Sequence, residues 1–261
     1  MSDQLHFDEA QSRAVEAVYA FKDVVEQRRL TLAALELAPG ERVLDIGCGP
    51  GYLAAEMAET VGAGGLVRGV DPSAPMLGLA ARREPSGDAA RIELSEGDAL
   101  SLPVPDSSFD VAVSTQVYEY VADIPAALAE ARRALRPGGR ILILDTDWDS
   151  IVWRSSDDER MARVLSAWDE HLAHRDLPRH LPQLLDEGGF KLSKAQVVPM
   201  LNVGYDRASY SAGVLGLIAD FVIGRHEISE ESARAWAADL SGLGPHYFFS
   251  LSRYLFVAEA R

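Results

Sequence analysis

Short apolar runs alternate with segments of helical periodicity from residue 42 to residue 145. The apolar runs are short enough for buried strands, and polar or turn residues follow each of them. Because parallel strands need crossover connections, this alternation predicts an α/β fold with a parallel sheet. Earlier, apolar residues recur at spacings of three and four over residues 5–37, which predicts two helices that end near Pro39 and Gly40.

The pattern changes after Asp145, where the fifth predicted strand ends. Residues 157–173 and 181–190 predict helices, and residues 191–203 and 247–258 predict strands. Between those strands, residues 204–245 contain two helical patterns, although a hairpin needs only a few residues. We interpret residues 204–245 as an inserted lid over a substrate pocket. The alternative is a structural helix pair that covers a sheet edge.

Composition narrows the range of partners and locations. The chain has 261 residues, 48% of them hydrophobic, which is typical of a single globular domain. A net charge of −15 disfavours a nucleic-acid partner, because such binding relies on basic patches. The one cysteine, Cys48, allows no intramolecular disulfide and no cysteine metal site. No apolar run approaches 18 residues and no leader-like segment is visible, so we expect a cytoplasmic protein without membrane insertion.

Residues 43–52, V-L-D-I-G-C-G-P-G-Y, form the most informative motif. A short strand meets Asp45, and Gly47, Gly49 and Gly51 follow at alternate positions before a helix. Glycine tolerates positive φ and lets a ligand approach the backbone at a helix N-terminus. The spacing is G-x-G-x-G, whereas the dinucleotide fingerprint would need its third glycine at residue 52. The loop resembles motif I of the class I S-adenosylmethionine (SAM)-dependent methyltransferases.

Further motifs follow in the order and at the spacing of that family. Asp71 ends an apolar run twenty residues after Gly51, where a doubly wound fold holds ribose hydroxyls. The resemblance implies that Met76, after Pro72, packs on adenine and that Asp98 accepts from the adenine amino group. It also implies that Asp45 anchors the glycine loop through hydrogen bonds. The expected cofactor-binding residues are Asp45, Gly47, Gly49, Gly51, Asp71, Pro72, Met76, Gly97, Asp98, Ala99, Ser114 and Thr115.

The glycine loop, the G-V-D-P-S segment and the L-R-P-G-G turn most resemble the ubiquinone/menaquinone C-methyltransferase-like group. The resemblance implies a Rossmann-like, seven-stranded, doubly wound sheet with N-terminal helices and a helical insertion before the last strand. It implies SAM as cofactor and S-adenosylhomocysteine (SAH) as product. We therefore expect one domain over residues 1–261, with N-terminal helices at 1–38, a SAM-binding core at 40–150 and the insertion at 204–245.

The sequence does not identify a catalytic base. Methyl transfer from SAM needs alignment and exclusion of water, and a base helps where the acceptor loses a proton. Candidates are Tyr118 after the fourth strand, His171 in the long helix and His246 before the last strand. Aromatic packing for Tyr118 and a solvated surface position for His171 are the alternatives. The alternating acids Asp145, Asp147 and Asp149 could hold Mg²⁺, but they match no family ligand pattern, so we expect no metal site.

Many aromatic residues in the C-terminal third suit a ring-bearing acceptor. We therefore expect methyl transfer to oxygen or carbon of a small aromatic or polyketide-like molecule. Two alternatives stay open: a fold that uses bound SAM for non-methyl chemistry such as cyclisation, and a non-catalytic SAM-binding module. Whether the chain forms a homodimer is also open.

Overall fold

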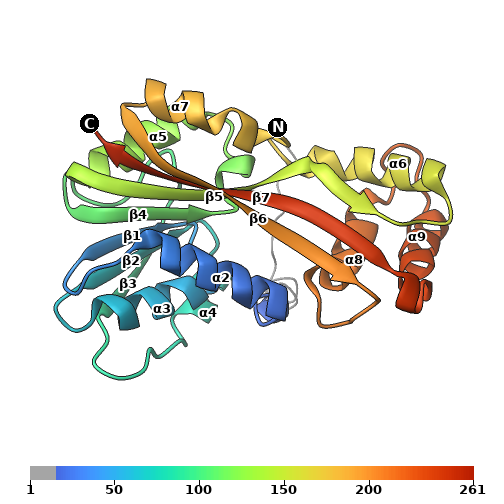
Figure 1. Ribbon diagram of the computed structural model, residues 1–261, viewed down its shortest axis with the longest axis horizontal. Coiled ribbons are helices and arrows are strands. Elements are labelled where there is room, and N and C mark those ends of the chain that lie inside the picture. The colour runs from blue at the N-terminus through green and yellow to red at the C-terminus, as the bar shows by residue number, and fades with distance from the viewer. Residues whose placement is uncertain (1–15) are drawn as a thin grey trace.

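A single seven-stranded sheet forms the centre of the molecule (Figure 1). The computed structural model describes residues 16–261. The strand order is β3-β2-β1-β4-β5-β7-β6; strands β1 to β5 are parallel, and β7 is antiparallel to both of its neighbours. This arrangement confirms the predicted α/β fold with a seven-stranded sheet. The strands are β1 (Arg42–Ile46), β2 (Leu66–Asp71), β3 (Arg91–Glu96), β4 (Phe109–Thr115), β5 (Leu135–Trp153), β6 (Phe190–Val203) and β7 (Phe248–Ala260).

Helices cover both faces of the sheet. The adjacent residues Val43 and Leu44 are both fully buried, and they belong to different hydrophobic cores because side chains alternate across a strand. The core of Val43 includes residues from α2 (Lys22–Leu35) and α3 (Tyr52–Val61), and that of Leu44 includes residues from α5 (Ile124–Ala134) and α7 (Leu181–Glu187). Helix α2 is the second predicted N-terminal helix, whereas most of the first lies in residues 1–15, outside the described residues.

The last three strands of the sheet continue well past its parallel part. Residues 146–153 of β5, 198–203 of β6 and 248–253 of β7 form a three-stranded extension, which we call the arm. The prediction that the fifth strand ends at Asp145 was therefore wrong. Figure 1 shows that the carboxyl ends of the parallel strands point toward the part of the molecule that contains the arm.

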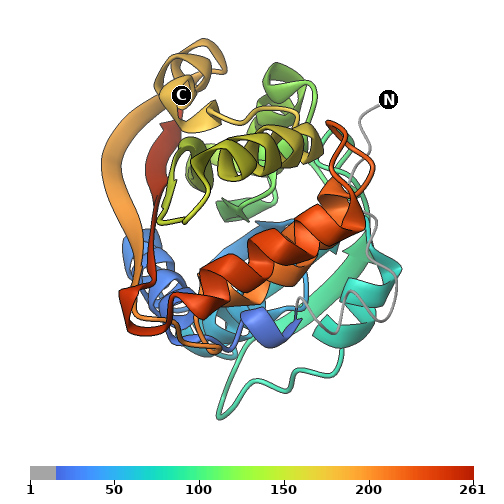
Figure 2. The same ribbon diagram turned by 90° about the vertical axis from the view of Figure 1, so that its right-hand side faces the viewer.

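Three helices pack against the arm and form a separate hydrophobic core with it (Figure 2). They are α6 (Asp158–Trp168), α8 (Tyr210–Val222) and α9 (Glu230–Gly242). Each begins at a side-chain cap, respectively Asp157, Ser209 and Ser229. Helices α8 and α9 confirm the two helical patterns predicted within residues 204–245. Their contact with α6 shows that the helical layer also draws on residues before β6.

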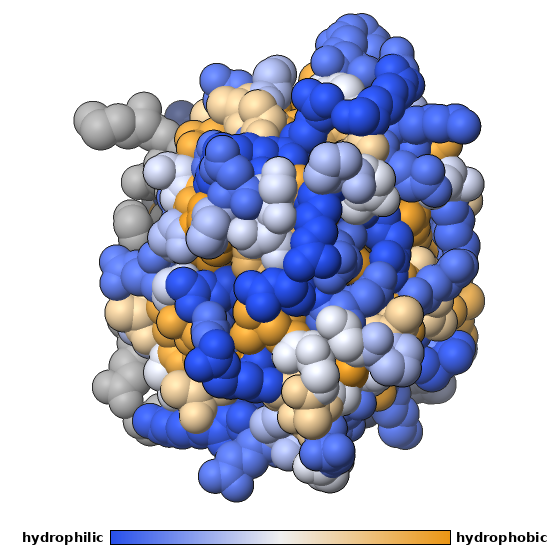
Figure 3. Space-filling model, turned by 90° about the vertical axis from the view of Figure 1, so that its left-hand side faces the viewer, coloured by the Kyte–Doolittle hydropathy of each residue, from blue (hydrophilic) through white to orange (hydrophobic). Residues whose placement is uncertain are grey.

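The opposite end of the molecule, at the amino ends of the parallel strands, is mostly hydrophilic, with only small separate apolar areas (Figure 3). Within residues 16–261, no helix is both long and apolar enough to cross a membrane.

Candidate functional site

The loop between β1 and α3 adopts the conformation that its glycines predict. Gly47, Gly49 and Gly51 have φ values of +72°, +51° and +78°, which side chains rarely tolerate. A Cβ atom on Gly51 would lie 2.8 Å from that of Ala80 in α4 (Ala74–Ala80). The amide of Gly47 donates to the carbonyl of Val70 at 2.7 Å. The loop is therefore packed tightly against the end of β2.

Asp71 holds the glycine loop in place from the end of β2. Its carboxylate accepts hydrogen bonds from the amides of Gly49 at 2.8 Å and Ser73 at 2.9 Å. Each carboxylate oxygen has a second acceptor position. The side chain can therefore support the loop and still accept from a ligand hydroxyl.

Asp45 does not anchor the loop, contrary to the expectation above. Its side chain is 1% exposed, and Oδ2 has no hydrogen-bond partner within the part of the chain that the structure describes. Burial, followed by the nearby charge of Asp71, raises the pKa of Asp45 to about 7. A buried carboxylate without a partner fits a ligand that carries a positive group.

The other expected cofactor residues also lie at the carboxyl edge of the parallel strands. Ser114 and Thr115 end β4, and the Oγ of Ser114 is buried without a partner among residues 16–261. The amide of Gly97 donates to the carbonyl of Asp71 at 3.2 Å, which joins the end of β3 to that of β2. Asp98 is exposed, and its carboxylate accepts from the amide of Leu100 at 2.6 Å. Pro72 is exposed, whereas Met76 and Ala99 are buried.

A buried carboxylate pair, Glu119 and Asp145, lies beside this edge. Both residues are fully buried. Oε2 of Glu119 accepts from the amide of Thr146 at 3.0 Å and from the indole of Trp148 at 3.3 Å, while Oδ1 of Asp145 accepts from the amide of Val117 at 3.1 Å. Within residues 16–261, the second oxygen of each acid has no hydrogen-bond partner.

Burial is the main cause that raises the pKa of both acids in this pair, and the charge of Glu119 raises the pKa of Asp145 further. The Thr146 amide, the positive charge of Arg253, and hydrogen bonds from Trp148 and Tyr120 act in the opposite direction on the pKa of Glu119. Backbone hydrogen bonds and the charge of Arg253 also act to lower the pKa of Asp145. Because the pKa of Asp145 is raised well above its usual value and the charge of Glu119 contributes to that shift, Asp145 is the more readily protonated of the two acids.

Arg253 of β7 is fully buried and contributes a positive charge to the same region. Nη1 donates to the side-chain oxygen of Gln27 in α2, and the guanidinium carbon lies 4.4 Å from the centre of the Tyr210 ring in α8. In the described residues, neither Nε nor Nη2 has an acceptor. Neither Arg253 nor Glu119 was predicted from the sequence.

Aromatic side chains surround these charges. The pKa of Tyr120 is raised well above its usual value by burial and then by the charges of Glu119, Tyr210, Asp145 and Tyr19, so these groups lie close together. The Tyr120 ring is also 5.9 Å from that of His171. The site therefore lies where Tyr19, the end of β4, the middle of β5, β7 and α8 meet.

Comparison with known proteins identifies the class of protein to which this chain belongs. A family model described as a methyltransferase domain matches residues 44–143. Over 119 residues, the chain is 41% identical to 2-phytyl-1,4-naphtoquinone methyltransferase of Synechococcus elongatus, an alignment that covers 45% of this chain and 51% of that relative. The chain belongs to the class I SAM-dependent methyltransferases. Its cofactor is SAM.

Another relative aligns with nearly the whole chain, well beyond the residues that the family model matches. An uncharacterized 37.1 kDa protein in transposon TN4556 of Streptomyces fradiae is 35% identical over 253 residues, which cover 96% of this chain and 70% of that protein. The structure of phosphoethanolamine N-methyltransferase 2 of Haemonchus contortus in complex with SAM shares the fold. Its TM-score is 0.63 at 20% identity, over 99% of this chain and 58% of that one. The present chain spans about half the length of the Synechococcus naphtoquinone methyltransferase that it matches.

The three candidate catalytic residues of the methyltransferase lie in different environments. Tyr118, in η1 (Tyr118–Tyr120), is fully buried among core residues that include several from α5, which favours the packing alternative. His246 is exposed in η4 (Gly244–His246), just before the outer end of the arm. At about 3.3 Å per strand residue, the start of β7 is roughly 20 Å from Tyr254, which pairs with Asp145. The arm therefore separates His246 from the carboxylate pair.

His171 is buried, so the alternative of a solvated surface position is wrong. Its ring stacks on Trp168 with 3.6 Å between ring centres, and Nδ1 contacts the carbonyl of Trp168. Burial lowers the pKa of His171 to about 4. A neutral imidazole therefore joins the aromatic wall of the methyltransferase beside Tyr120.

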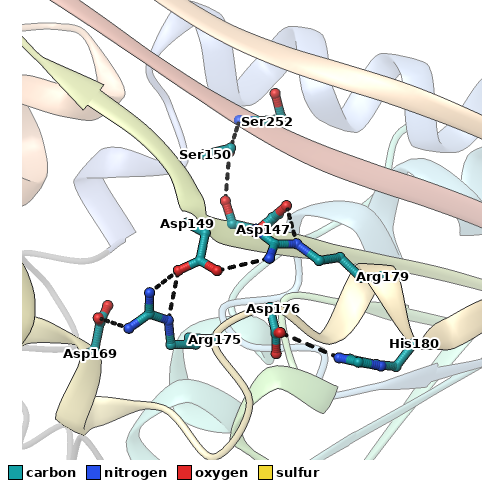
Figure 4. A network of polar contacts seen from close by, with 9 residues as sticks. All are labelled: Asp147, Asp149, Ser150, Asp169, Arg175, Asp176, Arg179, His180 and Ser252. Atoms are coloured by element: carbon teal, nitrogen blue, oxygen red, sulfur yellow. Dashed lines mark hydrogen bonds and ion pairs between the residues drawn. The ribbon is translucent and has the colours of Figure 1, made fainter.

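The acids that continue β5 in the methyltransferase are paired with arginines (Figure 4). Asp147 accepts from Nη2 and Nε of Arg179 at 2.9 Å and 3.0 Å, and Asp149 pairs with both Arg175 and Arg179. Among residues 16–261, the structure shows no group of three or more metal-ligating side chains. These arginines instead neutralise the two carboxylates.

Proposed function

We propose that the glycine loop and the ends of β1 to β4 bind SAM, and that the chain methylates oxygen or carbon of a small aromatic or polyketide-like acceptor. The observation that carries this proposal is the joint geometry of Asp71, Gly49 and Asp45. Asp71 supports the loop and keeps acceptor positions for ribose hydroxyls, while the unpartnered carboxylate of Asp45 suits the positively charged aminoacyl end.

The remaining cofactor assignments follow the same edge. Asp98 is exposed near the end of β3, where its carboxylate can accept from the adenine amino group. Met76 and Ala99 provide apolar surface for the adenine ring. Bound SAM supplies an electrophilic methyl group on a sulfonium.

We assign the acceptor to the region where this edge meets the helices on the arm. Tyr120, His171, Trp148 and Phe221 interact there through ring contacts, with 5.3 Å between the ring centres of Trp148 and His171 and 5.9 Å between those of His171 and Phe221. Aromatic walls with a few polar groups are typical of sites for ring-bearing ligands. The similarity to a naphtoquinone methyltransferase supports an aromatic acceptor of this kind.

The remaining groups at this site can position the acceptor and exclude water. Helix α8 places Tyr210 against Arg253, while β5 carries Trp148 toward His171. Removal of water strengthens electrostatic contacts with the reacting group.

The proposal is tested by incubating the purified protein with SAM and a panel of aromatic hydroxyl compounds, including naphthohydroquinones. We expect the mass gain of one methyl group on an acceptor, together with one SAH for each methylated product. Binding of SAM without a mass gain on any ring-bearing acceptor, or a mass gain confined to aliphatic amines, would contradict the proposed acceptor class.

A further inference from the structure

Arg253 has an unfilled hydrogen-bonding edge in the interior of the protein. On β7 it lies between Thr146 of β5 and Val198 of β6, and its side chain is fully buried. Nη1 donates to the side-chain oxygen of Gln27, whereas Nε and Nη2 have no acceptor within residues 16–261. A buried guanidinium with unpaired N–H groups is costly, so these two donors indicate a missing oxygen partner.

The geometry of the two unused nitrogens defines the kind of partner. Nε–H and one Nη2–H lie on the same side of the planar guanidinium and can donate in parallel to an oxyanion. The ring of Tyr210 lies against the guanidinium, and the Tyr210 hydroxyl also interacts with Arg253, which leaves the Nε–Nη2 edge as the side without an acceptor in the described residues. The side-chain oxygen of Gln27 in α2 accepts from Nη1, the third nitrogen of the guanidinium.

The charged residues near the Nε–Nη2 edge of Arg253 include a group that can accept a proton from a bound ligand. Glu119 of η1 and Asp145 of β5 both interact electrostatically with Arg253, and each has a buried oxygen without a partner in the described residues. Tyr19 and Tyr210 are the other titratable groups facing Arg253. A proton acceptor and an oxyanion-binding cation therefore lie in one buried region.

We propose that the acceptor carries an acidic hydroxyl, a phenol or an enol, which binds as its oxyanion to the Nε–Nη2 edge of Arg253 while Glu119 takes its proton. This inference rests on the proposed function and names the substrate class of the same site. It also applies to methylation at oxygen and at carbon, because a phenolate or enolate delivers its electron pair through either atom.

The step balances in atoms and charge. The O–H bond of the acceptor breaks, its proton passes to Oε1 of Glu119, and the electron pair stays on the oxygen beside Arg253. A bond then forms between the oxygen or conjugated carbon and the methyl group that SAM supplies, and the electron pair of the broken S–C bond remains on sulfur as SAH forms. For methylation at carbon, the methylated ring carbon gives its proton to a water molecule, the C–H electron pair restores the conjugation of the ring, and the oxygen takes back its proton from Glu119.

The test uses 4-nitrophenol, a phenol whose anion absorbs visible light, added to the SAH-saturated protein. Because a cation within a few ångströms favours the charged form, the wild-type protein should lower the apparent pKa of the bound phenol by about one unit or more. Arg253→Met should abolish that shift, and Arg253→Lys should retain part of it. Arg207→Met, which removes an exposed arginine from the segment before α8, is the matched control.

Several outcomes would overturn the inference. One is an unchanged or raised pKa of the phenol on the wild-type protein, another is an equal shift with Arg253→Met, and a third is failure of 4-nitrophenol to bind. If Arg253→Met does not fold, the comparison of wild type with Arg253→Lys decides. 4-Nitroanisole, which lacks the acidic hydroxyl, should bind at least tenfold more weakly; equal binding would also contradict the inference. Calorimetry with SAH on the same samples separates the two proposals, because absent SAH binding overturns the cofactor site itself.

Discussion

The carboxylate of Asp71 accepts a hydrogen bond from the amide of Gly49 at 2.8 Å. The residue expected to bind the ribose thus also supports the loop expected to contact the aminoacyl end. Two adjacent parallel strands are tied together at their carboxyl ends by this one side chain, and the amide of Gly97 extends the connection to β3.

Replacement of Asp71 should therefore affect both affinity and stability. Asp71→Ala should weaken SAM binding by about 1–3 kcal/mol, because a charge-assisted hydrogen bond is lost. The same variant leaves the Gly49 amide without its partner, which should lower the free energy of unfolding by about 1–3 kcal/mol. Calorimetry and urea unfolding measure the two effects, with the exposed Asp88→Ala as control. Unchanged SAH affinity in folded Asp71→Ala would remove the ribose assignment.

Glycine at position 51 is required by both its backbone and its surroundings. Gly51→Ala places a Cβ 2.8 Å from that of Ala80 at a φ of +78°, so it should destabilise the protein by about 1–3 kcal/mol. Gly78→Ala is the matched control. Gly78 lies in α4, and an added Cβ meets no atom within 4 Å, so alanine should be neutral or stabilise the helix. Equal thermal stability of the two variants would contradict this account of the loop.

SAM affinity should depend on pH through Asp45. Its pKa of about 7 means that the carboxylate ionises as pH rises through neutrality, and only the ionised form attracts a positively charged ligand. Affinity should therefore increase from about one pH unit below 7 to about one unit above. Binding should release a proton, which calorimetry in buffers of different ionisation enthalpy detects. Asp45→Asn should bind more weakly above neutrality and lose the proton release; a wild-type pH slope in this variant would refute the assignment.

His171 should make the folded state less stable in acid. Its pKa falls from 6.5 to about 4 on folding, so the unfolded chain binds more protons between these values. The contribution of His171 is present above pH 6.5 and is lost as pH falls toward 4, by on the order of 3 kcal/mol. Over much of this range Asp45 acts in the opposite direction, because its folded pKa is raised and its contribution to stability falls as pH rises.

The effect of His171 is therefore measured as the difference in unfolding free energy between wild type and His171→Asn across this pH range. Wild type should lose stability relative to the variant as pH falls. The exposed His180→Asn serves as control. Parallel pH profiles for wild type and His171→Asn would show that His171 does not titrate as a buried group.

The conformation of the glycine loop could be predicted because its signals are local in the sequence. Gly47, Gly49 and Gly51 fix a turn by their own conformational freedom, and Asp71 ends an apolar strand. The support of the loop by Asp71 rather than Asp45 could not be read in this way. It depends on which carboxylate faces the Gly49 amide across two strands.

The arm and the charged part of the site depend on contacts between distant segments. In the sequence, the acidic residues after Asp145 are typical of a loop. In the structure, Arg175 pairs with Asp149 and Arg179 pairs with Asp147, and these ion pairs allow β5 to continue. A signal for Arg253 was present: Leu251 and Leu255 lie two residues to either side on the same pleat face, and both are buried. A charged residue on an otherwise buried face indicates a functional or paired group. Its partners on α2 and α8 are visible only in the fold.

Calorimetric titration of SAH into the wild-type protein tests the central claim most directly. The account predicts one bound molecule per chain with micromolar affinity, and loss of most of that affinity in Asp71→Ala. Absence of SAH binding by the folded protein, or equal binding by both proteins, would contradict the claim that the glycine loop and Asp71 form the cofactor site.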